Sequence, residues 1–503
     1  MTTWPLLTWI ILVPWLGALL LAALPHTRPG VIRGLALAYS LSTLVLGLIA
    51  WTRLDPAVGY QFVERHAWVP SLNITYHLGL DGLSLLLVLL TGLVAPTALL
   101  ASWNVSRNPR LFALLFLFLQ GSALGVFLAL DFFHWFIFWE LSLVPAFFLI
   151  KLWGGPGAPR AAYQFVIYTI GGSAFMLAGF AALYTVAGTL DFTVLARLGE
   201  AGTLAERLGP TGMTIVFLGV LLGLAVKVPL FPFHTWLPAA YAEAPTGASM
   251  FLTGVMSKMG VYGFIRILFP IFPTELTAAA PVLLWLALGG VVLGAFAAMA
   301  QSDLKRMIAY SSVNHVSYCL VALFAVAGAT APNPAADAAA LGGALLQMFN
   351  HGLSASALFF CIGILETRAG GRRGLCDFGG VRTAAPVFAG FCGIALFSSL
   401  GLPGLNGFVG EFLIFRGVFG HAPWAAAVGC IGLFATAYFL LTFWQKVFHG
   451  PAAGAGAGFR DLTARELVTL LPAIILMFVL GVWPQALMSF VNPWVNAWLA
   501  TLP

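Results

Sequence analysis

Residues 132–153 read FFHWFIFWELSLVPAFFLIKLW, a mostly apolar stretch with a single acid, Glu140, near its centre. A helix of about 20 apolar residues is long enough to cross the hydrocarbon core of a bilayer. The whole chain has this character. Of its 503 residues, 61% are hydrophobic and only 8% are charged, against about half and about a quarter in soluble domains. A water-soluble fold could not bury so much apolar side chain, so the sequence predicts an all-α polytopic membrane protein.

The same length criterion, applied along the chain, predicts about fourteen transmembrane helices. Two linkers, 53–79 and 188–210, are long enough to hold additional structure, and 188–210 could form a short interfacial helix. The predicted spans are 4–24, 31–52, 80–102, 111–130, 132–153, 162–187, 211–236, 244–269, 277–300, 304–328, 338–366, 384–416, 423–448 and 465–490.

Two of these spans contain residues that interrupt a helix: Pro229 and Pro232 in the seventh, Gly401 and Pro403 in the twelfth. The breaks lie five spans apart, and an odd offset reverses the direction of a helix across the membrane. The pattern therefore predicts two inverted five-helix repeats, each with a broken helix, around a transport site near the midplane. The predicted divisions are 1–110 (spans 1–3), 111–270 (first repeat, spans 4–8), 271–450 (inverted repeat, spans 9–13) and 451–503 (C-terminal helix, span 14).

The basic residues indicate how the chain is oriented. Fifteen Lys and Arg fall in the loops that follow odd-numbered spans, six fall on the opposite face, and Lys227 and Lys258 belong to neither. Because cytoplasmic loops carry the excess of Lys and Arg, we expect the odd loops in the cytoplasm and both termini on the non-cytoplasmic side. This placement also explains the net charge of +6 without nucleic acid as a partner.

Four charged side chains fall deep inside predicted spans: Glu140, Lys227, Lys258 and Glu411. A charge at the bilayer centre costs about 2.5–3.5 kcal/mol even on the lenient insertion scale, so it is tolerated only where it faces the bundle or water. The plainer alternatives are a protonated carboxyl bonded to backbone for Glu140 and a lysine that snorkels to the surface for Lys227. Span 7 continues on both sides of Lys227, which favours a transport role.

Polar residues at helical spacing add candidate relay groups. Gln347, His351 and Ser354 share one face of span 11, and Ser311, His315 and Tyr318 form a similar stripe on span 10. A single histidine on an apolar face is usually a hydrogen-bonded core residue, but two such stripes on adjacent spans favour a proton relay through His351. Lys305, at the start of span 10, and His234, after the span-7 break, are further possible relays, whereas Arg266 reads as an interfacial anchor.

A set of this kind can move protons by electrostatic coupling. Opposite charges about 7 Å apart interact by about 2.4 kcal/mol at an effective dielectric of about 20. Opening and closing a Glu140–Lys227 pair would therefore change how tightly each group holds its proton. Na⁺ is less favoured as the transported ion, because only two central carboxylates are present.

The cysteines indicate no metal centre. Cys319, Cys361, Cys376, Cys392 and Cys430 never approach CxxC spacing, and all but Cys376 lie in apolar runs. Disulfide frameworks, zinc sites and iron–sulfur ligation therefore have no support in the sequence. We predict no metal and no cofactor in this chain.

Seven stretches, in order over about residues 75–450, carry a family resemblance. They resemble chain M of respiratory complex I, the antiporter-like membrane subunit of NADH:quinone oxidoreductases. The stretches are GLDGLSLLLVLLTGL (79–93), FWELSLVPAFFLIKLWGG (138–155), AVKVPLFPFHTWLP (225–238), EAPTGASMFLTGVMSKMGVYGFIR (243–266), AQSDLKRMIAYSSVNH (300–315), FNHGLSASALFF (349–360) and GLPGLNGFVGEFLIF (401–415).

The resemblance implies fourteen helices with two broken helices and inverted repeats. It also implies proton translocation driven by quinone reduction elsewhere in an assembly, so flavin, iron–sulfur clusters and quinone are expected in partner subunits. The family's essential acid maps to Glu140, its broken-helix lysine to Lys227, its central lysine to Lys258, its histidine to His351 and its terminal acid to Glu411. Lipids, protons and other membrane subunits of a bacterial inner membrane, cytoplasmic or thylakoid-type, are the expected partners.

The sequence departs from the family in two places. The family usually reads WLPDAH where this chain reads WLPAAY, so Ala239 and Tyr241 replace an acid and a histidine, and Gln164 stands where a lysine is common. These departures leave open a paralogous chain M, a cyanobacterial-type variant, or a subunit of an Mrp-type cation/proton antiporter or membrane-bound hydrogenase. A structural spacer that has lost transport is less favoured, because the central charges are present.

Overall fold

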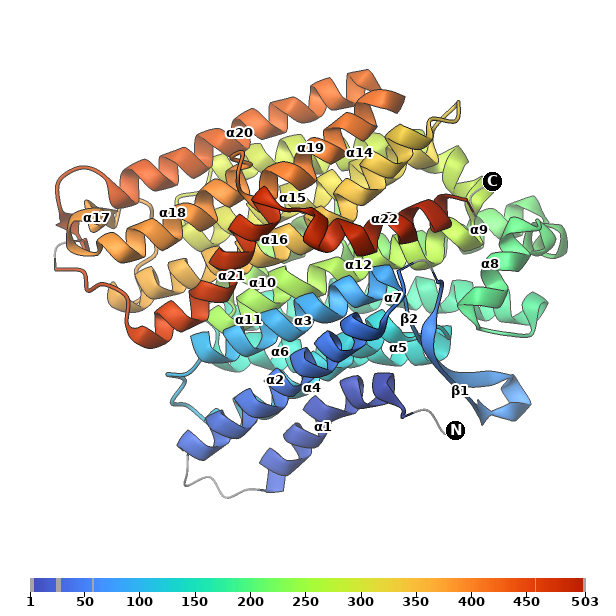
Figure 1. The fold of residues 1–503 in the computed structure, drawn as a ribbon, viewed down its shortest axis with the longest axis horizontal. Coiled ribbons are helices and arrows are strands. Elements are labelled where there is room, and N and C mark those ends of the chain that lie inside the picture. Colours follow the sequence, from blue (N-terminus) through green and yellow to red (C-terminus); the bar gives the residue numbers. More distant parts are fainter. Residues whose placement is uncertain (1–3, 24–28, 57, 457, 501–503) are drawn as a thin grey trace.

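The computed structural model describes residues 4–23, 29–56, 58–456 and 458–500, in which long helices lie side by side along the longest axis of the molecule (Figure 1). Thirteen described helical segments are long and apolar enough to cross a membrane. A fourteenth span consists of two shorter helices, Pro386–Leu400 and Asn406–His421, on either side of a break. The protein is thus a polytopic helical membrane protein, as predicted, with fourteen spans in the described residues.

The first seven spans begin and end close to the predicted residues, with two differences. The span predicted at 132–153 is interrupted at Ser142, and the one predicted at 211–236 begins earlier and stops at Lys227. The short helix expected within 188–210 is present as α8. The helices are α1 (Leu6–Ala23), α2 (Pro29–Arg53), α3 (Gly82–Ala101), α4 (Pro109–Leu128), α5 (Phe132–Leu141), α6 (Leu143–Trp153), α7 (Ala158–Ala187), α8 (Phe192–Glu200) and α9 (Thr203–Lys227).

The chain between residues 228 and 271 is the least regular part of the bundle. After the break at Val228–Pro232 the seventh span resumes and runs on to Glu243 rather than ending at 236. The eighth span alternates α-helix with two π-helical segments, which are often found at functional sites. The elements are η2 (Phe233–Trp236), α10 (Leu237–Glu243), α11 (Thr246–Phe251), η3 (Leu252–Met256), α12 (Ser257–Gly263), η4 (Phe264–Leu268) and α13 (Phe269–Ile271).

The C-terminal half holds the longest helix, α16, and the second break. The last predicted span, 465–490, is divided into two helices around Trp483 and Pro484, because a proline removes a backbone donor and clashes with the preceding turn. The helices are α14 (Pro273–Met299), α15 (Leu304–Ala327), α16 (Pro334–Arg368), α17 (Val381–Ala384), α18 (Pro386–Leu400), α19 (Asn406–His421), α20 (Pro423–Phe448), α21 (Ala464–Val482) and α22 (Gln485–Leu499).

The prediction of an all-helical chain omitted two small antiparallel sheets. The linker 53–79 folds as a hairpin of β1 (Gln61–Val69) and β2 (Ile74–Leu80), joined through the 3₁₀ turn η1 (Pro70–Leu72). The Glu64 carboxylate of β1 accepts the backbone N–H of Leu7 at 2.7 Å, which ties the hairpin to α1. A second pair, β3 (Phe378–Gly379) and β4 (Ala453–Gly454), joins two loops.

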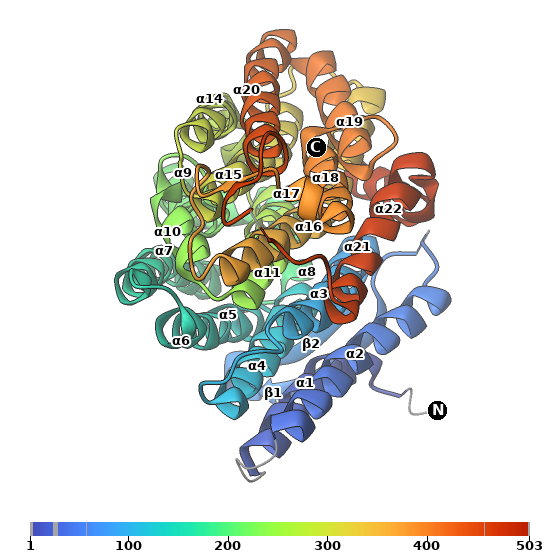
Figure 2. The ribbon, with the colours of Figure 1, turned by 90° about the vertical axis from the view of Figure 1, so that its left-hand side faces the viewer.

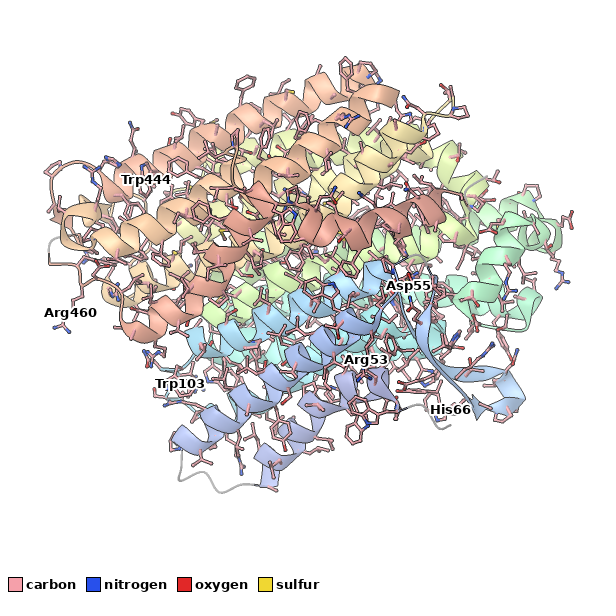
Figure 3. The ribbon with its side chains drawn as sticks, in the orientation of Figure 1. Arg53, Asp55, His66, Trp103, Trp444 and Arg460 are labelled. Carbon is pink, nitrogen blue, oxygen red and sulfur yellow. The ribbon has the colours of Figure 1, made fainter. Side chains whose placement is uncertain are left out.

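Loops after odd and even spans gather at opposite ends of the bundle. Figure 3 shows Arg460 at one end and His66, on the hairpin, toward the other. At the first end Arg368 binds Glu466 at 2.6 Å, and at the hairpin end Arg65 binds Asp191 at 3.0 Å. Burial alone would raise the pKa of Asp191, but hydrogen bonds from His77 and Thr193 outweigh it and lower the pKa to about 2.

The interior of the bundle is formed by its least hydrophobic spans. The segments Thr246–Ile271, Leu304–Ala327 and Pro334–Arg368 are the least apolar of the thirteen, yet they are the most completely buried. Figure 2 shows α16 surrounded by other helices, and it packs against α15, α18, α19 and α3. In a membrane the most apolar helices face lipid while polar side chains turn inward, so the buried spans are the ones expected to contain functional polar residues.

Small residues allow α16 and α19 to approach closely, as is common between membrane helices. A Cβ at Gly417 would lie 2.4 Å from the backbone nitrogen of Ala340, and a Cβ at Gly343 would lie 2.6 Å from that of Ile414. Neither position has room for even a methyl group. This close contact positions the broken helix α19 against α16.

We therefore expect Gly417→Ala to destabilise the protein by roughly 1–3 kcal/mol, the usual cost of overpacking. Thermal unfolding of the detergent-purified protein would show a lower midpoint. Gly390→Ala is the matched control, because nothing lies within 4 Å of a Cβ built there. Equal midpoints for the two variants would contradict the close approach of α16 and α19.

Candidate functional site

A continuous series of buried ionisable side chains crosses the centre of the bundle. The Lys258 ammonium lies 2.7 Å from Nδ1 of His351. The rings of His351 and His315 are 5.5 Å apart, and Nδ1 of His315 lies 3.1 Å from Oε1 of Glu411. All four residues are at most 5% exposed. Three helices and the irregular span 8 thus bring together groups that lie up to 153 positions apart in the sequence, from 258 to 411.

Irregular backbone positions the first member of this series. Lys258 is the second residue of α12, directly after the π-helical segment η3. Its ammonium donates to the backbone carbonyl of Thr253 at 2.7 Å and to Oγ of Ser257 at 3.2 Å, besides contacting His351. Three partners replace much of the hydration that the ammonium loses on burial.

The last member of the series lies beside the second break. Gln347 donates to Oε1 of Glu411 at 3.2 Å, on the same carboxylate oxygen that faces His315. Gly410 lies against Gln347, so the two helices meet without an intervening side chain. Gln347 is therefore part of the site, whereas its proposed function as a relay stays a prediction.

Lys227 and Glu140 form a second, separate part of the site. Lys227 is the last residue of α9, directly before the break, and is 3% exposed. Its ammonium lies 4.9 Å from the centre of the Trp139 ring and has no hydrogen-bond partner among the described residues. Glu140 is adjacent to Trp139 and half-buried, near enough for its charge to act on Lys227, but the two are not in ion-pair contact. The predicted pair is thus open in this structure.

The two parts of the site differ in their relation to the breaks. Lys227 precedes its break, whereas Glu411 lies six residues after Leu405, at which the second break ends. They do not hold matching positions on their broken helices. The inverted repeat itself, and the division of the chain built on it, stay predictions.

The other candidate relays have different surroundings. Lys305 forms an ion pair with Glu366 at 2.6 Å and belongs to a charge cluster at the end of the bundle, with Arg373 bound to Glu243 and Asp303. His234 stacks on Phe231, half-buried beside Tyr310 rather than in the central series. Ser311 is buried on α15, and Tyr318 lies 5.8 Å from the His315 ring and accepts a hydrogen bond from Asn314.

Several polar residues that the sequence argument did not select support the second break. Asn350 donates to the backbone carbonyl of Asn406 at 2.7 Å, and Ser398 donates to the Asn406 side chain at 2.5 Å. These bonds link α16 and α18 to the start of α19, directly after the second break. Asn350 lies three residues after Gln347, on the same helical face, which is the signal that could have identified it.

Arg266 is not the interfacial anchor that the sequence suggested. Its guanidinium is buried, donates to the Asp81 carboxylate at 2.7–2.8 Å and contacts the hydroxyl of Tyr60 at 2.6 Å. Trp494 of α22 donates to the same carboxylate at 2.8 Å. Burial raises the pKa of Tyr60, and this effect outweighs the positive charge of Arg266, which lowers that pKa. The cluster joins span 8 and the C-terminal helix to Tyr60 and Asp81, the residues directly before β1 and directly after β2.

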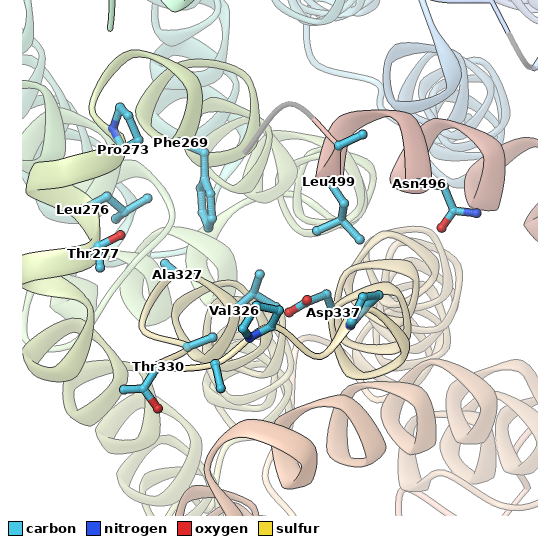
Figure 4. A pocket seen from close by; sticks show the side chains of 15 residues that line it. Phe269, Pro273, Leu276, Thr277, Val326, Ala327, Thr330, Asp337, Asn496 and Leu499 are labelled. Atoms are coloured by element: carbon cyan, nitrogen blue, oxygen red, sulfur yellow. The ribbon is translucent and has the colours of Figure 1, made fainter. Parts of the chain in front are cut away.

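A pocket at one end of the bundle is separate from this series. It opens where the loop between α15 and α16 meets α13, α14 and α22, and Asp337 is an acid on its wall (Figure 4). Its wall contains none of the candidate site residues. Within the described residues, no group of three or more His, Cys, Asp or Glu is placed to hold a metal ion.

Fold and site together define a class: a polytopic membrane protein that holds a series of acids and bases in its interior, next to two broken helices. Residues 129–439 match the family described as "NADH:quinone oxidoreductase/Mrp antiporter, TM". The NADH-quinone oxidoreductase subunit M of Mycobacterium tuberculosis (strain H37Rv) is 34% identical over an alignment of 537 positions, gaps included. The alignment covers 99% of this chain and 94% of that one. The chain therefore belongs to this family.

Solved structures agree. A chain in the structure described as respiratory complex I from Thermus thermophilus with bound NADH is 29% identical and superposes with a TM-score of 0.86 over 99% of this chain and all of that chain. A chain of the Mrp complex from Dietzia sp. DQ12-45-1b matches with a TM-score of 0.85 over the full length of both, but at 21% identity it shares only the fold.

We expect Asn350→Leu to lower the thermal unfolding midpoint of the protein, because the buried hydrogen bond from Asn350 to the Asn406 carbonyl would be lost, at a cost of about 0.5–1.5 kcal/mol. Asn496→Leu, at an exposed position of α22, is the control and should leave the midpoint unchanged. If both variants unfold at the wild-type temperature, Asn350 does not support the break.

Proposed function

We propose that this chain is the proton-translocating, antiporter-like membrane subunit of a complex I-type NAD(P)H or ferredoxin:quinone oxidoreductase. In this proposal H⁺ moves through Glu140, Lys227, Lys258, His351, His315 and Glu411. The observation that carries it is the Lys258–His351–His315–Glu411 series, which is continuous and buried. Redox chemistry would take place in partner subunits, which would hold the flavin, iron–sulfur clusters and quinone.

The geometry suits proton transfer rather than binding of a metal cation. A lysine and a histidine 2.7 Å apart present one hydrogen bond between two basic nitrogens, so a single proton can be held by either. Nε2 of His351 and Nε2 of His315 lack hydrogen-bond partners among the described residues, so each can take up or release a proton. A dehydrated Na⁺ would require several converging oxygens, and this series offers only the Glu411 carboxylate.

Charge coupling supplies the driving step. A proton added at one member of a buried series raises the energy of a positive charge on its neighbours, because burial strengthens the electrostatic interaction between them. Closing the Glu140–Lys227 pair would hold the positive charge near Glu140, and opening it would release a proton toward Lys258. Conformational change in the partner subunits would open and close this pair.

Membership in an Mrp-type antiporter is the second candidate, supported by the shared fold. Purification in mild detergent would distinguish the two. Co-purifying subunits with flavin and iron–sulfur absorption support the oxidoreductase, whereas an assembly of membrane subunits alone, with pH-dependent Na⁺/H⁺ exchange, supports the antiporter.

Replacing Glu140 by Gln should reduce proton pumping by roughly tenfold or more, as expected when a proton-transfer group is lost. The measurement is quinone-reduction-driven acidification in sealed vesicles containing the assembled complex. Glu206→Gln, at an exposed acid outside the site, is the matched control and should pump normally. Normal pumping by Glu140→Gln would contradict the proposed route.

We also propose that the loops after odd spans face the cytoplasm and that both termini lie on the other side. Cys376 is the one exposed cysteine of the described residues, in the loop between α16 and α17. Arg368, at the end of α16, donates to the carbonyl of Asp461, next to Arg460, so this loop lies at the end that holds Arg460. A membrane-impermeant maleimide should label it in inside-out vesicles and not in intact cells. Ser71→Cys in the hairpin, combined with Cys376→Ala, should show the opposite pattern; labelling of Cys376 from outside would reverse the orientation.

A further inference from the structure

One gap remains between the two parts of the site. Lys227 has no hydrogen-bond partner among the described residues. The Lys258 ammonium donates a hydrogen bond to the hydroxyl of Ser257. Between them lies a small cavity, with room for about one water molecule, that Lys227, Tyr241 and Ser257 share with apolar side chains. The cavity is thus polar at three points and apolar elsewhere.

Tyr241 holds a defined position at this cavity. It is buried on α10, and its hydroxyl donates to the backbone carbonyl of Leu252 at 2.9 Å, in the π-helical segment η3. A phenol whose hydrogen is engaged in this way keeps its oxygen lone pairs free to accept. The Ser257 hydroxyl is held in the same manner, because it donates to the Thr253 carbonyl at 2.7 Å. Both oxygens therefore accept hydrogen bonds at the cavity.

We propose that Tyr241 is a positioning residue that, with Ser257, holds one water molecule between Lys227 and Lys258 and so joins the two parts of the route; this rests on the proposed function. The water accepts a proton from the Lys227 ammonium while it gives one to the Ser257 hydroxyl. The Ser257 hydroxyl then turns from the Thr253 carbonyl toward Lys258 and passes its own proton to the neutral amine of Lys258. One proton moves, Lys227 becomes neutral and Lys258 charged, and no atom is gained or lost.

The geometry explains why a tyrosine suits this position. A buried ammonium without hydrogen-bond partners is costly, and a bridging water would give Lys227 one. A water in a protein interior needs two to four polar partners, and Lys227, Tyr241 and Ser257 supply three. Phenylalanine would fill the same volume but would leave the water with two.

The test uses the assembled complex, imaged at a resolution that shows ordered water, and the same preparation reconstituted into vesicles. Wild type should show one water between Lys227 and Ser257. Tyr241→Phe should lose this water and pump protons about tenfold more slowly. Tyr241→His, which keeps a donor and an acceptor, should recover part of the rate.

Tyr262→Phe is the matched control, because the Tyr262 hydroxyl also donates to a buried carbonyl, that of Phe127, away from the cavity. It should keep the water and the pumping rate. If Tyr241→Phe does not assemble, Ser257→Ala gives the same test, with Ser122→Ala as its control, since both serines donate to the carbonyl four residues earlier.

The outcomes separate the two proposals. Absence of water in the wild type, or a Tyr241→Phe variant that keeps the water and pumps normally, overturns the role of Tyr241. Normal pumping by Lys227→Ala overturns the proposed function itself. Loss of pumping in Lys227→Ala together with normal pumping in Tyr241→Phe removes only Tyr241 from the route.

Discussion

The structure depends on one constraint: an ionisable group inside a lipid-embedded bundle must find its partners within the protein. Each unpartnered charge at the membrane centre costs several kcal/mol, so acids and bases there are stable only together or with water. Lys258, His351, His315 and Glu411 meet this constraint by contacting one another. The same constraint explains why the least hydrophobic spans are the most buried.

The helix breaks and π-helical segments help to meet that constraint, because they expose backbone groups that can bind buried side chains. An interrupted helix leaves backbone groups without partners, and in a membrane these must be bonded by side chains or water. Trp236 does so at the first break by donating to the carbonyl of Val226 at 3.0 Å. At the second break, Asn350 and Ser398 donate to the carbonyl and the side chain of Asn406 and link the neighbouring helices. In η3, the Thr253 carbonyl accepts from Lys258 and the Leu252 carbonyl from Tyr241. Irregular backbone thus supplies acceptors at the depth where charges need them.

The sequence sufficed for the features that depend on local composition. Apolar length predicted the spans, and prolines and glycines predicted both breaks. Charges in apolar runs identified Lys258 and Glu411, which lie in the central series, and Glu140 and Lys227, which lie apart from it. It failed where a feature depends on distant partners. Arg266 resembled an anchor because its partner, Asp81, lies 185 residues away. The hairpin was missed because a criterion of apolar length does not detect two strands that pair with each other, and the π-helical segments have no pattern of their own.

The groups from Lys258 to Glu411 contact one another, whereas those around Lys227 do not, and this difference bears on how proton transfer could be controlled. From Lys258 to Glu411 the groups are in contact or nearly so, and in the proposed route a proton would need little rearrangement there. Between Glu140, Lys227 and Lys258 there is no direct contact, and Lys227 rests against the ring of Trp139. A transporter that is driven from outside needs one place where transfer is conditional, because a route that is continuous throughout would let protons leak back. In the proposed route, the break beside Lys227 is the position where a small movement of α9 would make or remove the connection.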